Sequence, residues 1–171
     1  MATSTKNLST YDKNTIPNAN DFRFGIVVSE WNAEITDALY QGALQTLLEN
    51  NVPRENIFKF NVPGSFELIY GAKKLCETER FHAIIVIGSV IEGDTKHFDF
   101  VCEGVTHGIK DLNIKYNTPV IFCVLTDHTW QQAKDRSGGK HGNKGIEAAV
   151  TAIKMTKFKN FELYPNGNYH K

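Results

Sequence analysis

The chain has 171 residues, of which 41% are hydrophobic, and this is enough for one domain with a packed core. Its 19 basic residues are balanced by 19 acidic residues, so its charge does not favour nucleic acid or an anionic membrane surface as a partner. No apolar run approaches the length of a membrane span. We therefore expect a globular protein whose partners are neither nucleic acids nor membranes.

The three cysteines, Cys76, Cys102 and Cys123, are far apart in the sequence and form no Cys-x-x-Cys pair. This spacing argues against a disulfide framework and against a structural zinc site. Residues 1–20 are polar and contain no apolar core of a signal peptide. We therefore expect a cytoplasmic protein with reduced thiols.

The chain begins with the polar residues 1–20, which we expect to form a mobile tail. Beyond this tail, short runs rich in β-branched and aromatic residues predict strands at residues 22–28, 57–62, 83–87 and 119–125. Apolar residues at helical spacing predict a helix after each strand, and a last helix carries Ile146, Ala149, Val150 and Ile153. Residues 159–171 form a predicted C-terminal tail.

Strands that alternate with helices indicate a parallel sheet covered on both faces. The predicted fold is α/β, a three-layer α/β/α sandwich with a four-stranded, mainly parallel sheet of the flavodoxin-like type. We expect one domain over residues 21–158, because the sequence has no internal repeat and no linker. In such a sheet, ligands bind at the carboxyl ends of the strands, in the turns that lead into helices.

The most informative of these turns follows the third predicted strand. Gly88 and Gly93 give the backbone freedom there, and Asp94 or Thr95 can cap the next helix. The first turn of a helix offers free N–H groups and the positive end of the helix dipole, which suit a phosphate. His97 falls in the same turn and can exchange a proton near neutral pH. From these residues alone, a phosphate site with a proton-transfer group and an ordinary surface turn are equal alternatives.

This turn resembles the lumazine synthase family in the motifs Gly88–Ser–Val–Ile91, Gly93–Asp–Thr95 and His97–Phe–Asp–Phe–Val101. The resemblance continues in motif order over residues 22–157. It implies a transferase of riboflavin biosynthesis that condenses 5-amino-6-(D-ribitylamino)uracil with 3,4-dihydroxy-2-butanone 4-phosphate. The products would be 6,7-dimethyl-8-ribityllumazine, phosphate and water, and neither a cofactor nor a metal would be needed.

For the butanone phosphate, the resemblance implies His97 as the general acid/base and Asp94, Thr95 and Arg136 as the residues that bind it. Arg136 belongs to a basic, glycine-rich loop, and Lys144 just beyond this loop is a candidate for supporting charge. Such a loop can close over a phosphate, although most loops of this composition are solvated surface.

For the pyrimidine, the resemblance implies residues from the turns after the first two strands and from the end of the third. They are Trp31, Ser65, Phe66, Glu67, Ser89, Val90 and Ile91, and Phe122 lines the pocket of a neighbouring subunit. Glu67 would reach the ribityl hydroxyls. Without the resemblance, we would expect Trp31 to pack against a helix or a subunit, and residues 63–67 to form an ordinary helix cap.

One residue departs from the family pattern, because Glu92 stands where many members carry arginine. This changes the charge beside the phosphate turn, and we expect the Glu92 side chain to point away from the phosphate. The family assembles as homopentamers with active sites between adjacent subunits. A shell of sixty subunits is open as a larger assembly, and riboflavin synthase is a candidate partner.

Two other functions remain as alternatives: a non-catalytic flavin- or lumazine-binding protein on the same scaffold, and a structural shell protein with an inactive site. Thr95, His97 and Arg136 together argue against the binding protein. Other enzyme classes lack their motifs, because Asp94 replaces the lysine of a P-loop. Neither Gly-x-Ser-x-Gly nor His-Glu-x-x-His occurs in the sequence.

Overall fold

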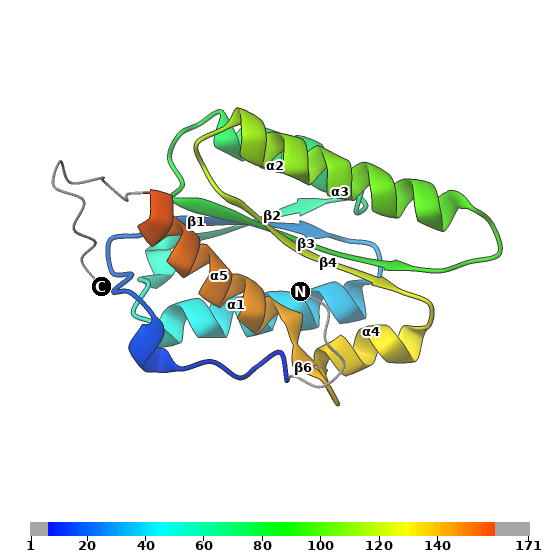
Figure 1. The fold of residues 1–171 in the computed structure, drawn as a ribbon, viewed down its shortest axis with the longest axis horizontal. Helices are drawn as coiled ribbons and strands as arrows, with labels where there is room; N and C mark the ends of the chain where they lie inside the picture. Colours follow the sequence, from blue (N-terminus) through cyan, green and yellow to red (C-terminus); the bar gives the residue numbers. More distant parts are fainter. Residues whose placement is uncertain (1–6, 160–171) are drawn as a thin grey trace, which may run out of the picture.

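The computed structural model describes residues 7–159 of the chain. Its main sheet has four parallel strands in the order β2-β1-β3-β4 (Figure 1). The strands are β1 (Phe24–Ser29), β2 (Ile57–Val62), β3 (Ala83–Ile91) and β4 (Val120–Asp127). The predicted α/β fold with a four-stranded parallel sheet is therefore confirmed. Because β1 and β3 are neighbours in the centre, their carboxyl ends lie side by side.

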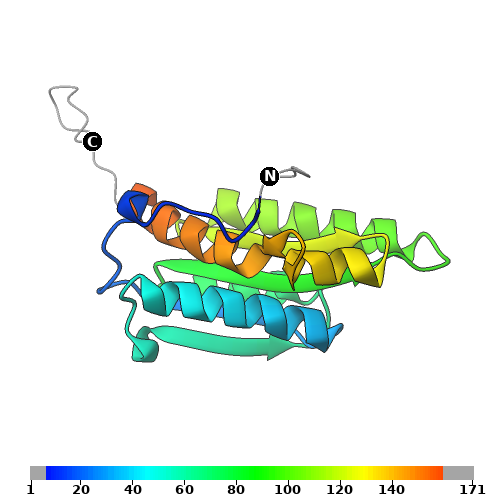
Figure 2. The ribbon, with the colours of Figure 1, turned by 90° about the horizontal axis from the view of Figure 1, so that it is seen from below.

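Helices cover both faces of this sheet (Figures 1 and 2). On one face lie α2 (Leu68–Cys76) and α3 (His97–Lys115), and on the other lie α1 (Ala33–Glu49), α4 (Trp130–Arg136) and α5 (Lys144–Lys159). Short 3-10 helices occupy Lys13–Thr15 and Arg54–Asn56. Within residues 7–159, none of the helices combines the length and the apolar character that crossing a membrane requires.

The sheet separates two apolar cores, and β3 contributes to both because its side chains alternate between the faces. Ile85 and Ile87 pack with residues of α1 and α5, whereas Ile84 and Val86 pack with residues of α2 and α3. All four side chains are fully buried. A strand covered on both faces needs an apolar side chain at every position, which explains the uninterrupted apolar run in this part of the sequence.

The third strand continues to Ile91, beyond the predicted end at residue 87. Gly88 therefore belongs to the strand rather than to the turn in which the sequence analysis placed it. A Cβ atom at Gly88 would lie 2.6 Å from the Oγ atom of Ser65 and 3.0 Å from the Cδ1 atom of Leu68. Close packing, rather than backbone freedom, is the reason for glycine at this position, and it lets the start of α2 lie against β3.

The glycine-rich loop after α4 folds into a small hairpin of β5 (Ser137–Gly139) and β6 (Gly142–Asn143). Gly138, with a φ of 129°, and Gly142, with a φ of 85°, adopt backbone conformations that favour glycine. The sequence predicts only a loop here, because strands this short have no alternating apolar pattern.

The side chain of Asn143 holds this hairpin against α1. Its amide nitrogen donates hydrogen bonds to the carbonyl oxygens of Ala38, at 2.9 Å, and Ser137, at 3.1 Å. Its Oδ1 atom accepts a hydrogen bond of 2.8 Å from the backbone N–H of Gly145. Asn143 is 9% exposed, so these bonds are shielded from water and fix the position of the hairpin.

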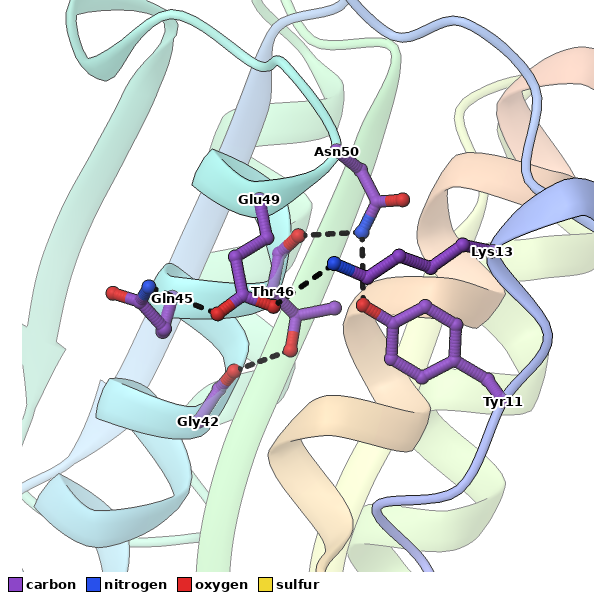
Figure 3. Close-up of polar contacts among 7 residues, drawn as sticks. All are labelled: Tyr11, Lys13, Gly42, Gln45, Thr46, Glu49 and Asn50. Carbon is purple, nitrogen blue, oxygen red and sulfur yellow. Dashed lines mark hydrogen bonds and ion pairs between the residues drawn. The ribbon is translucent and has the colours of Figure 1, made fainter.

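The described part of the N-terminal segment lies along α1 and α5 (Figure 2). The hydroxyl oxygen of Tyr11 accepts a hydrogen bond of 3.2 Å from Asn50, and Lys13 forms an ion pair of 3.9 Å with Glu49. Both contacts are drawn in Figure 3. The backbone N–H of Asn143 donates a 2.9 Å hydrogen bond to the Ser9 hydroxyl. The polar sequence predicts a mobile tail here and does not indicate these contacts. Residues 1–6 and most of the predicted C-terminal tail lie outside the described residues.

Candidate active site

A cavity of about 730 Å³ opens at the carboxyl ends of β1 and β3, where the turns into α2 and α3 meet. We call it the first cavity. It is lined by Trp31, Asn32, Pro63, Gly64, Ser65, Phe66, Glu67, Ser89, Val90, Ile91, Gly93, Thr95, His97, Phe98, Phe100 and Val101. The turn between β3 and α3 extends beyond the end of the sheet (Figure 1). This is the place where a parallel α/β sheet binds its ligands.

Trp31 lies in the turn after β1 and is 71% exposed, so it does not pack against a helix of its own chain. Its backbone N–H donates a 3.2 Å hydrogen bond to the carbonyl oxygen of Pro63. The next residue, Asn32, has a φ of 57°, and its side-chain amide donates a 2.9 Å hydrogen bond to the carbonyl oxygen of Ser89. These two bonds tie together the walls of the first cavity and leave the indole ring free to stack on a planar ligand.

Ser65, Phe66 and Glu67 precede α2, whose N-terminus has no hydrogen bond from a capping side chain. The ordinary helix cap that the residues alone favoured is therefore absent from α2. Phe66 is 53% exposed, and a Cβ atom at Gly104 of α3 would lie 2.7 Å from its ring. Gly104 thus leaves room for this ring, which forms an exposed apolar wall of the first cavity.

Three buried polar atoms lie at the ends of neighbouring strands. The Oγ atoms of Ser29 in β1 and Ser89 in β3 and the Oδ2 atom of Asp127 in β4 have no hydrogen-bond partner among the described residues. Almost all buried polar groups in proteins have a partner, and each exception needs an explanation. The gathering of these exceptions at one edge of the sheet indicates that this edge serves function as well as stability.

Helix α3 begins at His97, which the sequence placed in the first helical turn, but the expected cap by Asp94 or Thr95 was wrong, because Lys96 is the N-cap residue and no described side chain caps the helix. The Thr95 hydroxyl accepts a 3.4 Å hydrogen bond from the backbone N–H of His97. Both residues line the first cavity, but Asp94 does not. Gly93 also lines the cavity, and a side chain would fit there, because an added Cβ atom would have no heavy atom within 4 Å. The first cavity therefore combines a histidine, a hydroxyl and the N-terminal end of a long helix.

The structure divides the predicted site residues into two groups. Phe122 and Lys144 lie apart from the first cavity, in a second cavity of about 340 Å³ between β4 and α5. Arg136 ends α4 and lies beside Asp127, with 3.5 Å between its Nε atom and the Oδ1 atom of the carboxylate. Within a single chain, the walls of the first cavity therefore do not include Phe122, Arg136 or Lys144.

Glu92, the residue that departs from the family pattern, forms an ion pair with His128. It does not line the first cavity, and the expectation that its side chain points away from a bound phosphate stays a prediction. The His128 ring also lies near Phe98, with 6.2 Å between the ring centroids. The Glu92–His128 pair links the turns after β3 and β4. Where many family members carry an arginine, this chain thus has an acid that is paired with a nearby histidine.

None of the three cysteines lines the first cavity. Burial raises the pKa of the Cys123 thiol to about 12 and that of the Cys76 thiol to about 11, so both stay protonated at neutral pH. Among residues 7–159, no group of histidine, cysteine and acidic side chains could hold a metal ion.

Comparisons with known proteins agree with this geometry. The family model described as 6,7-dimethyl-8-ribityllumazine synthase matches residues 21–160. The chain belongs to this family. Among curated lumazine synthases, that of Flavobacterium johnsoniae is 69% identical, over 91% of this chain and 82% of the relative. That of Christiangramia forsetii is 65% identical, over 93% of this chain and 95% of the relative. The resemblance found in the sequence is confirmed, and with it a lumazine synthase enzyme of riboflavin biosynthesis.

Some residues that line the first cavity of this lumazine synthase were missed in the sequence. Phe98 and Val101 belong to a motif of the family resemblance but were not named as site residues, yet both line the first cavity. Asn32 carried a usable signal, because asparagine tolerates the left-handed backbone conformation that the turn requires. Asp127 carried no such signal in the sequence. Its burial and its ion pair with Arg136 arise only because α4 folds back over the end of β4.

Proposed function

We propose that this chain condenses 5-amino-6-(D-ribitylamino)uracil with 3,4-dihydroxy-2-butanone 4-phosphate. The products are 6,7-dimethyl-8-ribityllumazine, phosphate and water, and the reaction is the penultimate step of riboflavin biosynthesis. The observation that carries the proposal is the first cavity. It brings an exposed indole ring, a helix N-terminus and a histidine together in a chain of the lumazine synthase family.

The reaction needs proton transfer at each step. The amino group of the pyrimidine attacks the ketone, and an imine forms as water leaves. Phosphate is then eliminated, and the ribitylamino nitrogen closes the ring as a second water leaves. His97 is the general acid/base for these steps, because it is the ionisable ring on the wall of the first cavity beside Thr95.

The N-terminus of α3 is the proposed phosphate site. Its free N–H groups and the Thr95 hydroxyl suit the phosphate oxygens, and the helix dipole favours the negative charge of the leaving group. Asp94 contributes through its backbone, since a carboxylate would repel the phosphate. Arg136 supplies the forked cation that holds the phosphate, and Lys144 adds positive charge.

The pyrimidine binds on the aromatic side of the first cavity. Trp31 stacks on its ring, and the last residues of β3 with the turn before α2 contact its edge. These contacting residues are Ser65, Phe66, Ser89, Val90 and Ile91. Glu67, which is exposed on the cavity wall, accepts hydrogen bonds from the ribityl hydroxyls.

A second copy of the chain completes each site. This explains why Phe122, Arg136 and Lys144 belong to the same reaction as the first cavity although they do not line it. The exposed rings of Trp31 and Phe66 leave an apolar surface for the partner to cover. The proposed assembly is a homopentamer, with the sixty-subunit shell as a larger form. The proposed compartment is the cytoplasm, where riboflavin synthase uses the product.

A condensation assay tests the function. Purified protein is mixed with both substrates, and the fluorescence of the lumazine product is followed against a reaction without protein, because the substrates also react slowly on their own. We expect a protein-dependent rate that saturates with each substrate. Tight binding of the pyrimidine or of a flavin without any acceleration would instead establish the non-catalytic binding protein.

A further inference from the structure

Asp127 is a buried acid that the proposed mechanism does not use. It is the last residue of β4, and its side chain is 8% exposed. Its Oδ1 atom lies 3.5 Å from the Nε atom of Arg136, and its Oδ2 atom has no hydrogen-bond partner among the described residues. A buried carboxylate with one unpartnered oxygen is costly for folding, so stability alone does not explain it.

The backbone fixes Asp127 at the edge of the first cavity. It pairs with Ile91 in the register of β3 and β4, and Ile91 lines that cavity. The carbonyl oxygen of Asp127 accepts a 3.0 Å hydrogen bond from the backbone N–H of Glu92. The carboxylate is therefore held on a rigid strand, from which it can fix the side chain that Arg136 offers to the site of a neighbouring chain.

Helix α4 brings Arg136 back to this carboxylate. Thr129 and Gln132 form a capping box that fixes the start of α4, and Arg136 is its last residue. The contact with Asp127 uses the Nε atom, and among the described residues the Arg136 side chain makes no hydrogen bond. The two terminal nitrogens of the guanidinium group thus remain available to an anion, and they offer the parallel donors that a phosphate accepts.

Other charged groups near Asp127 are consistent with this arrangement. Burial raises the pKa of the Asp127 carboxyl, and the positive charges of Arg136 and His128 oppose this rise. His128 is itself paired with Glu92. Arg136 is therefore the cation that pairs directly with the Asp127 carboxylate.

We propose that Asp127 is a positioning residue that orients Arg136 through its Nε atom, so that the terminal nitrogens of Arg136 face the phosphate of the substrate. This inference rests on the proposed role of Arg136 in phosphate binding. Asp127 itself does not touch the substrate. A rigid, pre-oriented guanidinium group binds more tightly than a mobile one, because less conformational entropy is lost on binding.

The test compares Asp127→Asn, Arg136→Ala and the control Asp111→Asn in the full-length chain. Asp111 is an exposed acid of α3, and among residues 7–159 it pairs only with Lys110. For Asp127→Asn, we expect the KM of the butanone phosphate and the Kd of inorganic phosphate to rise about tenfold. The kcat value and the KM of the pyrimidine should stay within about twofold, which a general loss of structure would not produce.

Two results would overturn the inference in different ways. If Arg136→Ala weakens phosphate binding but Asp127→Asn leaves it unchanged or tightens it, Asp127 does not position the guanidinium group. If Arg136→Ala has no effect on the butanone phosphate, the proposed role of Arg136 fails, and the inference fails with it. In that case the condensation activity itself can still stand.

Arg136→Lys provides a second variant in case Asp127→Asn does not fold. Lysine keeps the charge but has no Nε donor for Asp127 and no fork for the phosphate. We expect the KM of the butanone phosphate to rise as in Asp127→Asn. A wild-type value would show that the orientation of the guanidinium group is not required.

Discussion

His97 is the first residue of α3, and it is the one histidine among the described residues that line the first cavity. Its role as general acid/base can be separated from a role in binding. Removal of a general acid/base slows catalysis by about 10²-fold to 10⁴-fold, whereas loss of a binding contact mainly changes KM.

His97→Ala should therefore lower kcat by at least about 10²-fold and change the Kd of the pyrimidine by less than about threefold. Steady-state kinetics and a fluorescence titration of the pyrimidine measure the two effects. His107→Ala, an exposed histidine on the same helix, is the matched control. Wild-type turnover in His97→Ala would remove this residue from the mechanism.

His82 makes stability depend on pH. Its Nδ1 atom accepts a 2.9 Å hydrogen bond from the backbone N–H of Arg23, so the ring must be neutral on that side. Burial, followed by the charges of Lys159 and Arg23, lowers the pKa of His82 below 6.5. The unfolded chain then binds more protons than the folded chain below about pH 6.5, and stability is lost as the pH falls through this range.

The free energy of unfolding should therefore decrease between pH 7 and pH 5, with at most about 1.4 kcal/mol per pH unit from this one proton. His82→Asn keeps an acceptor for the Arg23 N–H without a titrating ring, so its decrease should be smaller. Urea denaturation at a series of pH values measures both proteins. Equal slopes for the two proteins would show that His82 is not the cause.

The hairpin of β5 and β6 shows how one buried side chain can fix an element. Asn143 satisfies the Ala38 and Ser137 carbonyl oxygens and the N–H of Gly145, all in a buried place. The hairpin lies between Arg136 and Lys144, so its position also sets where these two cations lie.

Asn143→Ala should destabilise the protein by about 2–4 kcal/mol, because it leaves buried polar groups without partners. Chemical denaturation measures this loss. Asn20→Ala is the control, since the Asn20 side chain is exposed and makes no hydrogen bond. A loss below about 0.5 kcal/mol would mean that the hairpin does not depend on Asn143.

The regular elements of this fold follow from local patterns, and its special contacts do not. The apolar run before Gly88 and the helical spacing after His97 were enough to predict β3 and α3, because each element buries its own pattern. The predicted end of β3 at residue 87 was wrong. Residues 88–91 continue the strand because β4 pairs with them. Neither the hairpin nor the N-terminal contacts could be predicted, because they depend on polar partners distant in sequence.

For the candidate site, too, the sequence predicts the turns but not the contacts between distant residues. The turns that form the first cavity stand out as glycine-, serine- and aromatic-containing segments between strands and helices, and the family resemblance named the residues within them. The ion pair of Asp127 with Arg136 could not be found in this way. It arises from two elements that meet only after folding.

In the proposed assembly, two copies of the chain form each active site. Trp31, Thr95 and His97 line the first cavity, whereas Phe122 and Lys144 line the second and Arg136 lies beside Asp127. In a symmetric ring, every interface repeats the same contact between two different surfaces. A chain that lacks His97 can therefore still offer Arg136 to its neighbour.

The most direct measurement of this claim mixes two impaired variants at a substrate concentration below the KM of Arg136→Ala. His97→Ala and Arg136→Ala chains are co-refolded in equal amounts, and the condensation rate is compared with the mean of the two variants alone. If each site joins His97 of one chain to Arg136 of another, about a quarter of the random interfaces are intact, and about a quarter of the wild-type rate should return. A rate no higher than the mean of the two variants would contradict a site shared between chains.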